Sequence, residues 1–563
     1  MAEDINYHTM MATNKCRRIL QRAMAVCLGL GISCLATSAR ANSAPGRVSA
    51  ASARKRRLRP DVLRFRAQIE AALADGHAKR SFWGIVVADR DSGETLYELN
   101  ADHFFMPASN TKLFTTALAL AALGGRYQFR TTLESANRLD AEGKLAGDLV
   151  FVGRGDPDLS NRTFPYELKT ERDGPTEKVL AELADAAVAK GLREVDGDII
   201  ADDSYFPYDP YPQGWGVGDI FFEFGAPVSA FAFNDNSVSI QVVPGAQPGN
   251  PATLIVQPAA ALESFTNQIT TGQPRGNPYF VVARQPGPNF LSLGGTIPAG
   301  HAPADLELAM IAPAETAGLA MKQLLEQRGV RITGSVRVAH APAPETSDSS
   351  GFSPPLPPPA PSAAGPNPVV LAEHLSPPLI ESVRLTNKIS QNLHAELLLR
   401  TVAREKAGFG STEAGLKIEQ EFLKAAGVID GDVVLSDGSG LARDDLVTPR
   451  GVVALLQYAA HQTWGAEYIS TLPIAGVDGT LESRLKQATG NAVIQAKTGS
   501  LEHVRSISGY ATTERGESLI FAMFANNGTQ RGRDATSTLD AISMAMVRTL
   551  GVARRKPSSR KKE

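Results

Sequence analysis

The sequence predicts an α+β fold in which an antiparallel sheet, flanked by helices, is built from both ends of the chain and interrupted by a large strand-rich insertion. Two hairpin patterns indicate the sheet: residues 81–100 read SFWGIVVADRDSGETLYELN, and residues 506–527 read SISGYATTERGESLIFAMFANN. Apolar segments bounded by turn residues are typical of paired strands. An amphipathic pattern over residues 534–550 predicts a closing helix. Strands from the two ends of the chain are therefore expected to share one sheet.

A helix is predicted directly after the first hairpin, beginning near Pro107. Leu113, Ala117, Leu120 and Leu123 form one apolar stripe at helical spacing. Proline is also well suited to the first turn of a helix. The segment 106–123, MPASNTKLFTTALALAAL, is therefore expected to pack one face against the sheet.

The insertion carries a repeated local pattern. Helices are predicted at residues 176–190 and 314–328, and each ends in a glycine followed by a strand, in KGLREVDGDIIA and RGVRITGSVRVA. A third copy, AGVIDGDVVLSDG, begins at Ala426. The unequal separations argue against a solenoid, so we interpret the pattern as a reused helix-glycine-strand unit.

Length and charge describe an ordinary globular protein. The 563 residues exceed the roughly 100 to 200 of a single domain, so two or more domains are expected. A net charge of -2 and 21% charged residues give no global bias toward nucleic acid. Basic residues gather near both ends: Arg54, Lys55, Arg56, Arg57, Arg59, Arg554, Arg555, Lys556, Arg560, Lys561 and Lys562. We interpret them as solvated runs, with weak contact to an anionic membrane or wall polymer as the alternative.

The N-terminus has the three parts of a secretory signal peptide. Basic residues precede the apolar run 23–36, and the tripeptide 39–41 reads ARA, which predicts cleavage after Ala41. The apolar run is shorter than the ~20 residues that span a bilayer, although retention without cleavage is the alternative. All three cysteines, Cys16, Cys27 and Cys34, lie in or beside this segment, so the mature chain would have neither disulfide nor thiolate site. We expect an exported protein, periplasmic or otherwise extracytoplasmic.

A serine and a lysine lie three residues apart at the start of the predicted helix. Ser109 and Lys112 would share one helix face with Cβ atoms ~5 to 6 Å apart. The spacing alone is close to chance, because four other pairs have it: Ser52 with Lys55, Ser483 with Lys486, Ser558 with Lys561, and Ser559 with Lys562. The position of Ser109 is distinctive, because a helix N-terminus directs backbone N–H groups toward a reacting carbonyl. Taken singly, Ser109 is better explained as a capping serine.

Two further motifs stand far along the chain. Residues 390–392 read SQN ahead of a helical run, and a similar Ser-Ala-Asn at 135–137 lies in a strand-like context. Residues 497–500 read KTGS, a motif that occurs once, and the hairpin that follows would place it on an edge strand. Glycine in such a strand permits close backbone approach.

S-x-x-K, S-x-N and K-T-G in this order resemble the penicillin-binding proteins and serine β-lactamases. The chain most resembles the D-alanyl-D-alanine carboxypeptidase/endopeptidase family of low-molecular-mass class C penicillin-binding proteins, the serine peptidase family S13 type. That family has a long insertion between its first two motifs, and about 280 residues separate Ser109 from Ser390 here. Further resemblance lies in GRGDPDLS from Gly153, SDGSGLARDDLVTP from Ser436 and KTGSLEHVRSISGY from Lys497. Gln391 stands where Asp is common in the family, and little effect is expected.

The resemblance and chemical need together imply roles for these residues. Ser109 would be the nucleophile, Lys112 its base, and Lys497 the cation that favours neutral Lys112. Ser390 would relay a proton to the departing amine, and Asn392 would hold the substrate amide. The remaining implied roles are a carboxylate site made by Thr498 with Lys497, and an oxyanion hole made by the backbone N–H groups of Ser109 and Ser500.

The implied substrates are peptidoglycan stem peptides, with β-lactams as covalent inhibitors. The expected organisation is a signal peptide (1–41), a basic linker (42–60), the first part of a catalytic domain (61–131), inserted accessory domains (132–340), a proline-rich linker (341–370), the second part of the catalytic domain (371–552) and a basic tail (553–563). The residues leave the balance of carboxypeptidase and endopeptidase activity open.

The sequence leaves two alternative functions open. One is a β-lactamase or esterase of the same fold, which is disfavoured because no motif supplies a dedicated deacylation base. The other is a non-catalytic cell-wall-binding scaffold, which the presence of all motif side chains argues against. No metal, nucleotide or other cofactor is expected, because H-E-x-x-H and P-loop motifs are missing from the sequence. His394-Ala395-Glu396 is interpreted as ordinary helix packing, and the DGSG segment at 437–440 as a loop shaping the site.

Overall fold

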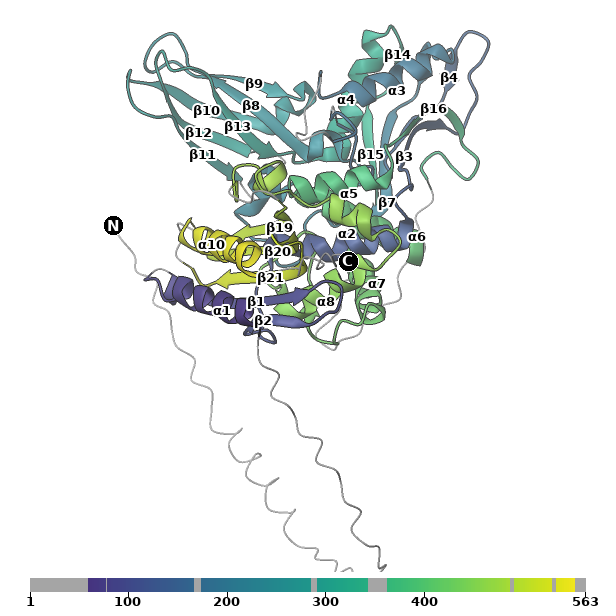
Figure 1. Ribbon diagram of the computed structural model, residues 1–563. Coiled ribbons are helices and arrows are strands. Elements are labelled where there is room, and N and C mark those ends of the chain that lie inside the picture. The colour runs from purple at the N-terminus through teal and green to yellow at the C-terminus, as the bar shows by residue number, and fades with distance from the viewer. Residues whose placement is uncertain are drawn as a thin grey trace, which may run out of the picture. The chain divides into compact units, whose positions relative to one another are not determined.

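The computed structural model describes residues 59–76, 78–160, 162–166, 174–284, 291–342, 362–486, 491–528 and 533–551 (Figure 1). The predicted signal peptide and basic tail lie outside these residues, as does most of the proline-rich linker. Among the helices in the described ranges, none is both long and apolar enough to cross a membrane.

One antiparallel sheet joins the two ends of the described chain, as predicted. Its strand order is β19-β20-β21-β1-β2. The bounds are β1 Phe82–Asp89, β2 Thr95–Leu99, β19 Val493–Leu501, β20 Val504–Thr512 and β21 Ser518–Asn526. Strand β1 pairs along its whole length with β21, Phe82 opposite Asn526 and Asp89 opposite Leu519. Because β19 is an edge strand, the KTGS motif lies where the sequence analysis placed it.

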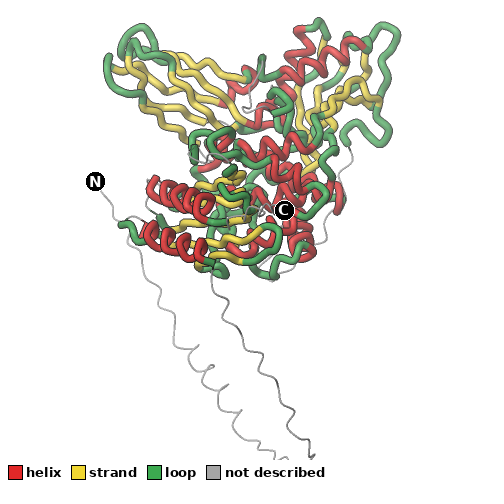
Figure 2. Tube along the Cα trace, viewed as in Figure 1, coloured by secondary structure: helices red, strands yellow, loops and turns green. Residues whose placement is uncertain are grey.

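Helices cover both faces of this sheet, which explains why its strands β1 and β21 are apolar at almost every position (Figure 2). Phe521 and Met523 of β21 pack into a core with α1 (Pro60–Leu73) and α10 (Arg533–Thr549). Ile520 and Phe524 point to the opposite face, where they share a second core with the remaining helices. Those helices are α2 Lys112–Leu123, α5 Leu379–Lys388, α6 Asn392–Ala407, α7 Thr412–Ala425, α8 Pro449–Ala460 and α9 Gly465–Ser470.

The segment between α2 and α5 folds into sheets of its own, which confirms a strand-rich insertion (Figure 1). One five-stranded sheet has the order β15-β7-β5-β3-β16. Its strands are β3 Arg130–Ser135, β5 Leu149–Val152, β7 Ile199–Pro207, β15 Val336–Ala341 and β16 Val369–Leu375. The smaller sheets contain β4 Lys144–Ala146, β6 Glu194–Asp196, β8 Ser237–Val243, β9 Thr253–Gln257, β10 Phe265–Gly272, β11 Tyr279–Arg284, β12 Leu291–Pro298, β13 Ala304–Ala309 and β14 Arg331–Ile332.

The first two helix-glycine-strand units lie side by side. Helix α3 (Lys178–Ala189) leads into β6 and β7, and α4 (Pro313–Gln327) leads into β14 and β15. Strand β6 pairs in parallel with β14, and β7 in parallel with β15. The linking residues Gly191 and Gly329 have φ of 102° and 81°, a left-handed conformation that glycine adopts without strain. The third unit differs, because its strand β17 (Val433–Val434) pairs only with β18 (Leu446–Val447) within the described chain.

Candidate active site

Ser109 lies in a turn at the start of α2, one of the helices on the face of the sheet opposite α1 and α10. The predicted helix begins as a 3-10 turn over Ala108–Thr111 and becomes α-helical at Lys112. Thr111 occupies the N-cap position, so Ser109 is not the capping serine considered above. Ala108 has a left-handed φ of 50°, which turns the chain sharply just before Ser109. Ser109 is partly exposed, whereas Lys112, one residue past the N-cap, is completely buried.

The Lys112 amine is surrounded by three oxygen atoms. Its Nζ lies 2.9 Å from Ser109 Oγ, 2.6 Å from Asn392 Oδ1 and 2.6 Å from the Ser439 carbonyl oxygen. A neutral amine can donate two N–H groups to the amide and carbonyl oxygens, which leaves its lone pair for the Ser109 hydroxyl proton. Burial lowers the pKa of Lys112 to about 7, against the opposing effect of Asp437, Glu396 and Asp445. The site can therefore hold Lys112 neutral near pH 7.

A second lysine lies on β19. Lys497 is completely buried and donates to Ser390 Oγ at 2.7 Å and to the Thr498 carbonyl at 2.8 Å. Burial and the charge of Lys112 both lower the pKa of Lys497 well below that of a free lysine. Ser390 has a left-handed φ of 65° in the short turn between α5 and α6, an uncommon conformation for serine that is concentrated at functional sites.

Strand β19 lies directly against the Ser109 turn. A Cβ atom at Gly499 would lie 2.7 Å from the Pro107 carbonyl oxygen and 3.0 Å from the Ser109 backbone nitrogen, and would also clash with Ser506 Oγ. The glycine is therefore required for packing within the protein, in addition to any approach of a substrate. Ser500, the next residue on the strand, is exposed, and Thr498 Oγ1 donates to Thr480 Oγ1 at 2.7 Å.

The structure thus brings together the predicted residues from three distant segments. Ser109, Lys112 and Asn392 form one hydrogen-bonded group, and Ser390 with Lys497 forms another. The charge of Lys112 lowers the pKa of Lys497, and β19, which carries Lys497, lies close to the Ser109 turn. The two groups therefore form one site.

The insertion contributes residues to the site that the sequence analysis did not identify. Asn392 Nδ2 donates to the Phe224 carbonyl at 2.7 Å, so both ends of this amide have protein partners. Trp215 Nε1 donates to Asp437 Oδ2 at 2.8 Å, and Arg443 pairs with Asp219 at 2.6 Å. Segment 215–224 therefore borders the site beside α6 and the DGSG loop.

The DGSG segment is a loop held by one carboxylate. Asp437 accepts backbone N–H groups from Ser439, Gly440, Leu441 and Ala442 at 2.6 to 3.1 Å. This geometry fixes the Ser439 carbonyl that faces Lys112, in agreement with the interpretation of this segment as a loop shaping the site.

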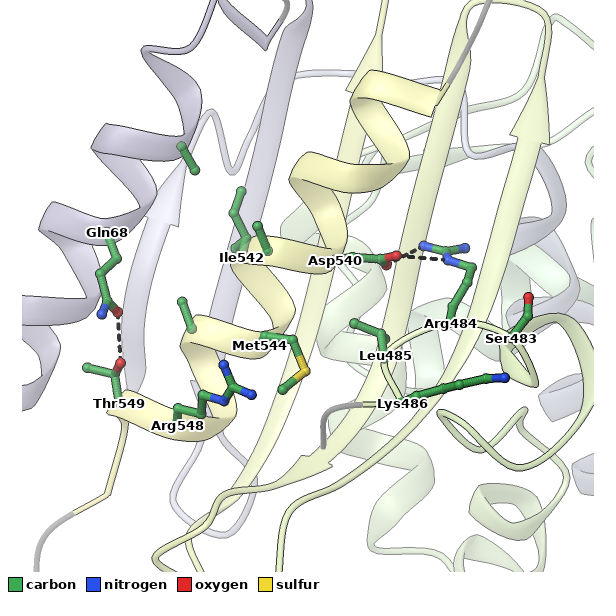
Figure 3. A pocket seen from close by; sticks show the side chains of 13 residues that line it. Gln68, Ser483, Arg484, Leu485, Lys486, Asp540, Ile542, Met544, Arg548 and Thr549 are labelled. Carbon is green, nitrogen blue, oxygen red and sulfur yellow. Dashed lines mark hydrogen bonds and ion pairs between the residues drawn. The ribbon is translucent and has the colours of Figure 1, made fainter. Parts of the chain in front are cut away.

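Other S-x-x-K and S-x-N patterns lie elsewhere or outside the described residues. Ser483 and Lys486 line a cavity of about 720 Å³ between α1, α10 and the loop after Leu481, on the opposite face of the sheet from Ser109 (Figure 3). Its Arg484 is paired with Asp540 at 2.6 Å. Asn137 of the Ser-Ala-Asn pattern donates to the Ala146 carbonyl, next to β4.

His394 follows the expectation of helix packing. It is completely buried on α6, and its Nε2 lies 3.0 Å from Asp235 Oδ1 in the insertion. Within the described residues, no group of three or more His, Cys, Asp or Glu side chains could hold a metal ion.

Comparisons with known proteins identify the family that the chain matches. The D-Ala-D-Ala carboxypeptidase 3 (S13) family matches residues 65–358 and 361–546. The D-alanyl-D-alanine carboxypeptidase of Actinomadura sp. (strain R39) is 32% identical over 520 residues, covering 90% of this chain and 88% of that protein. D-alanyl-D-alanine carboxypeptidase DacB of Haemophilus influenzae is 28% identical over 452 residues, covering 79% and 85%.

Solved structures show the same fold. The crystal structure of penicillin binding protein 4 (dacB) from Haemophilus influenzae aligns with a TM-score of 0.71 and 25% identity, covering 85% of this chain and 98% of that one. The same protein complexed with a novel β-lactam aligns with a TM-score of 0.66 and 24% identity, covering 85% and 98%. The predicted α+β fold is confirmed.

Proposed function

The chain belongs to the D-Ala-D-Ala carboxypeptidase 3 (S13) family, and we propose that Ser109 is the nucleophile with which this serine-type carboxypeptidase cleaves the bond after D-alanine in peptidoglycan stem peptides. One observation carries the assignment: the Lys112 amine is buried, with its nitrogen 2.9 Å from Ser109 Oγ and two further oxygens to accept its N–H groups. The family supports a peptidase over the alternatives of a β-lactamase or a scaffold.

Acylation begins with proton transfer from Ser109 to neutral Lys112. As the Oγ–H bond breaks, Oγ forms a bond to the carbonyl carbon of the penultimate D-alanine, and the carbonyl oxygen becomes an oxyanion. Backbone N–H groups of Ser109 and Ser500 would stabilise that charge, a contribution of about 3 to 4 kcal/mol per donor in other enzymes. The closeness of β19 to the Ser109 nitrogen supports this pairing of donors.

Collapse of the oxyanion breaks the C–N bond, and the departing amine takes up a proton. Ser390 can supply it, because its hydroxyl lies 2.7 Å from Lys497 Nζ, which can in turn replace the proton. Thr498, oriented by Thr480, and Lys497 would bind the terminal carboxylate. Water then attacks the acyl carbon and gives a proton to neutral Lys497 through Ser390, while Lys112 returns its proton to Ser109 Oγ as the ester bond breaks. The peptide leaves as a carboxylic acid that ionises in water, and both lysines regain their starting states.

A β-lactam would acylate Ser109 by the same route, since opening of its ring is the same acyl transfer. The Haemophilus influenzae protein complexed with a β-lactam has the same fold. Endopeptidase activity on cross-linked peptides would use the same steps. We also propose that the chain acts outside the cytoplasm after cleavage at Ala41.

The test compares the purified protein with Ser109→Ala, using a fluorescent penicillin and a pentapeptide ending in D-Ala-D-Ala. The wild type should be labelled covalently and should release D-alanine, and Ser109→Ala should do neither. Labelling that persists in Ser109→Ala would refute the nucleophile assignment. Rapid turnover of the penicillin would favour the β-lactamase, and no reaction with either compound would favour the scaffold.

A further inference from the structure

Four buried carboxyl groups lie beneath the Ser109 and Lys112 pair. Glu396 on α6, Glu419 on α7, and Asp437 and Asp445 on the loop that follows β17 each have at most 2% of their surface exposed. Burying carboxyl groups is costly unless they are hydrogen-bonded, paired or protonated. The free-energy cost of burying four of them around one catalytic lysine must therefore be offset by local hydrogen bonds, ion pairs or protonation.

Glu396 holds the loop that contacts Lys112. Its two carboxyl oxygens lie 3.0 and 3.1 Å from the Gly438 backbone N–H, which they accept. From the other side, Thr115 Oγ1 on α2 donates to the Gly438 carbonyl at 2.7 Å. The next carbonyl along the loop, that of Ser439, is the one that accepts from Lys112. Glu396 thus reaches Lys112 through a single short segment of backbone.

One face of α6 contacts Lys112 both directly and through this loop. Asn392 and Glu396 lie four residues apart, so they occupy the same side of the helix. The loop can lie against that side because residue 438 is glycine: a Cβ there would be 3.1 Å from the Ala395 carbonyl oxygen and 3.2 Å from Leu399 Cβ. Helix α6 therefore aligns the carbonyl and the amide that receive the two N–H groups of neutral Lys112.

The charge of Glu396 also acts on Lys112. The charged groups that act on Lys112 are Asp437, Glu396 and Asp445, which favour its charged form, and the charge of Lys112 in turn lowers the pKa of Lys497. Burial and the neighbouring Asp437 raise the pKa of Glu396 to about 8, and Arg400 opposes this rise.

Glu396 and Lys112 therefore compete for protons in the same pH range. A protonated Glu396 leaves fewer negative charges around Lys112 and favours the neutral amine. Burial and the neighbouring Glu396 and Asp437 raise the pKa of Glu419 to about 8 as well, but Glu419 is not among the groups acting on Lys112.

We propose that Glu396 is a positioning residue for the reaction: it holds the Gly438–Ser439 segment against Lys112, and its proton keeps negative charge away from that lysine so that Lys112 can act as the base. The inference rests on the proposed function, because it assumes that Lys112 activates Ser109. It adds a residue, one helical turn beyond Asn392, that touches neither substrate nor nucleophile.

The test measures the rate of Ser109 acylation by a fluorescent penicillin from pH 5 to pH 9 for four forms of the full chain. Glu396→Gln keeps an acceptor for the Gly438 N–H and removes the charge, whereas Glu396→Ala removes both. Glu419→Gln is the matched control, because it neutralises a second buried glutamate of similar pKa. Melting temperatures confirm that each variant is folded.

Glu396→Gln should leave the midpoint of the acidic limb within about 0.5 unit of the wild-type value, and the rates within about threefold, because glutamine reproduces the protonated acid that is already present there. Glu396→Ala should be about tenfold or more slower at every pH, because the Ser439 carbonyl is no longer held in place. Glu419→Gln should keep the wild-type midpoint.

A midpoint in Glu396→Gln displaced by more than about 0.5 unit from that of the wild type would overturn the proposal, as would wild-type rates in Glu396→Ala. A Glu396→Gln protein that does not fold would also overturn it, because glutamine has the shape of the protonated acid that the proposal takes as native. Absence of acylation in the wild type would instead refute the proposed function and is recognised before any variant is compared.

Discussion

The contact between Asn392 and Lys112 can be tested by changing one atom. In the wild type, the Lys112 amine donates to the neutral amide oxygen of Asn392 at 2.6 Å. Asn392→Asp replaces the amide nitrogen by oxygen and so places a carboxylate against that amine. A carboxylate at that distance stabilises the charged form of lysine. We therefore expect the pKa of Lys112 to rise and the supply of neutral base at pH 7 to fall.

The magnitude follows from the position of the lysine pKa. At about 7, roughly half of the Lys112 amines are neutral at pH 7, whereas an unperturbed lysine at about 10.4 would be neutral in fewer than one molecule in a thousand. A close opposite charge shifts a pKa by roughly 1 to 3 units. The Asn392→Asp variant should thus have a Lys112 pKa of about 8 to 10, and acylation at pH 7 should slow by about 5- to 500-fold.

The assay is the rate of covalent labelling by a fluorescent penicillin as a function of pH. The variant should recover most of its rate as the pH rises past 9, because the base is then neutral again. Gln391→Glu is the matched control: it makes the same amide-to-acid change one residue earlier, where the side chain caps α6 by accepting the Leu393 N–H at 3.0 Å. A loss in Asn392→Asp that does not recover at high pH would refute the electrostatic reasoning.

Three further changes test the packing around the site. Gly499→Ala should slow acylation about 100-fold, because the new Cβ meets the turn that carries Ser109, and labelling kinetics will show it. Asp478→Ala breaks a buried ion pair with Lys388 at 2.5 Å and should cost about 3 to 5 kcal/mol in urea unfolding. Burial raises the pKa of Asp156, so the folded protein loses stability as the pH rises through that pKa. Asp156→Asn cannot ionise and should therefore raise the Tm more at pH 8 than at pH 5.

Much of the central fold was predictable because its signals are local. Apolar segments bounded by turn residues identified both hairpins, and a glycine after each helix identified the repeated unit. Helix α1 was missed, although Val62, Phe65 and Ile69 follow its buried face and Pro60 begins it. The pairing of β16 with β3 of the insertion was also not predicted, because partner choice between distant strands depends on long-range packing that leaves no local pattern.

The proposed reactive residues were predictable as motifs, whereas their surroundings were not. Ser109, Lys112, Asn392 and Lys497 belong to short patterns whose chemistry is specific. Glu396 has no such pattern, and a glutamate in a helix is usually a surface residue. Its burial becomes visible only when α6, α7 and the DGSG loop are assembled, so the structure is needed to separate it from the other glutamates of the chain.

The two buried lysines raise the question of which one is neutral. Lys112 has three carboxyl groups that favour its charged form, whereas Lys497 has only uncharged hydrogen-bond partners in the described structure and feels the charge of Lys112. Without a bound anion these causes place a shared proton on Lys112 more often than on Lys497, whereas acylation uses the neutral fraction of Lys112. A substrate carboxylate bound beside Thr498 would hold the proton on Lys497, and that cation would in turn lower the pKa of Lys112.

The substrate carboxylate should therefore help to generate the neutral Lys112 that activates Ser109 for attack on the same substrate. We expect a depsipeptide ending in free D-lactate to show an acidic limb of acylation about 1 pH unit lower than the methyl ester of the same compound. Rates measured from pH 5 to pH 9 by release of lactate or its ester provide the comparison. Thr498→Val, which weakens carboxylate binding, should reduce the difference between the two midpoints. Identical midpoints in the wild type would mean that the order of the two lysines is set by the protein alone, because the substrate charge would then have no effect on it.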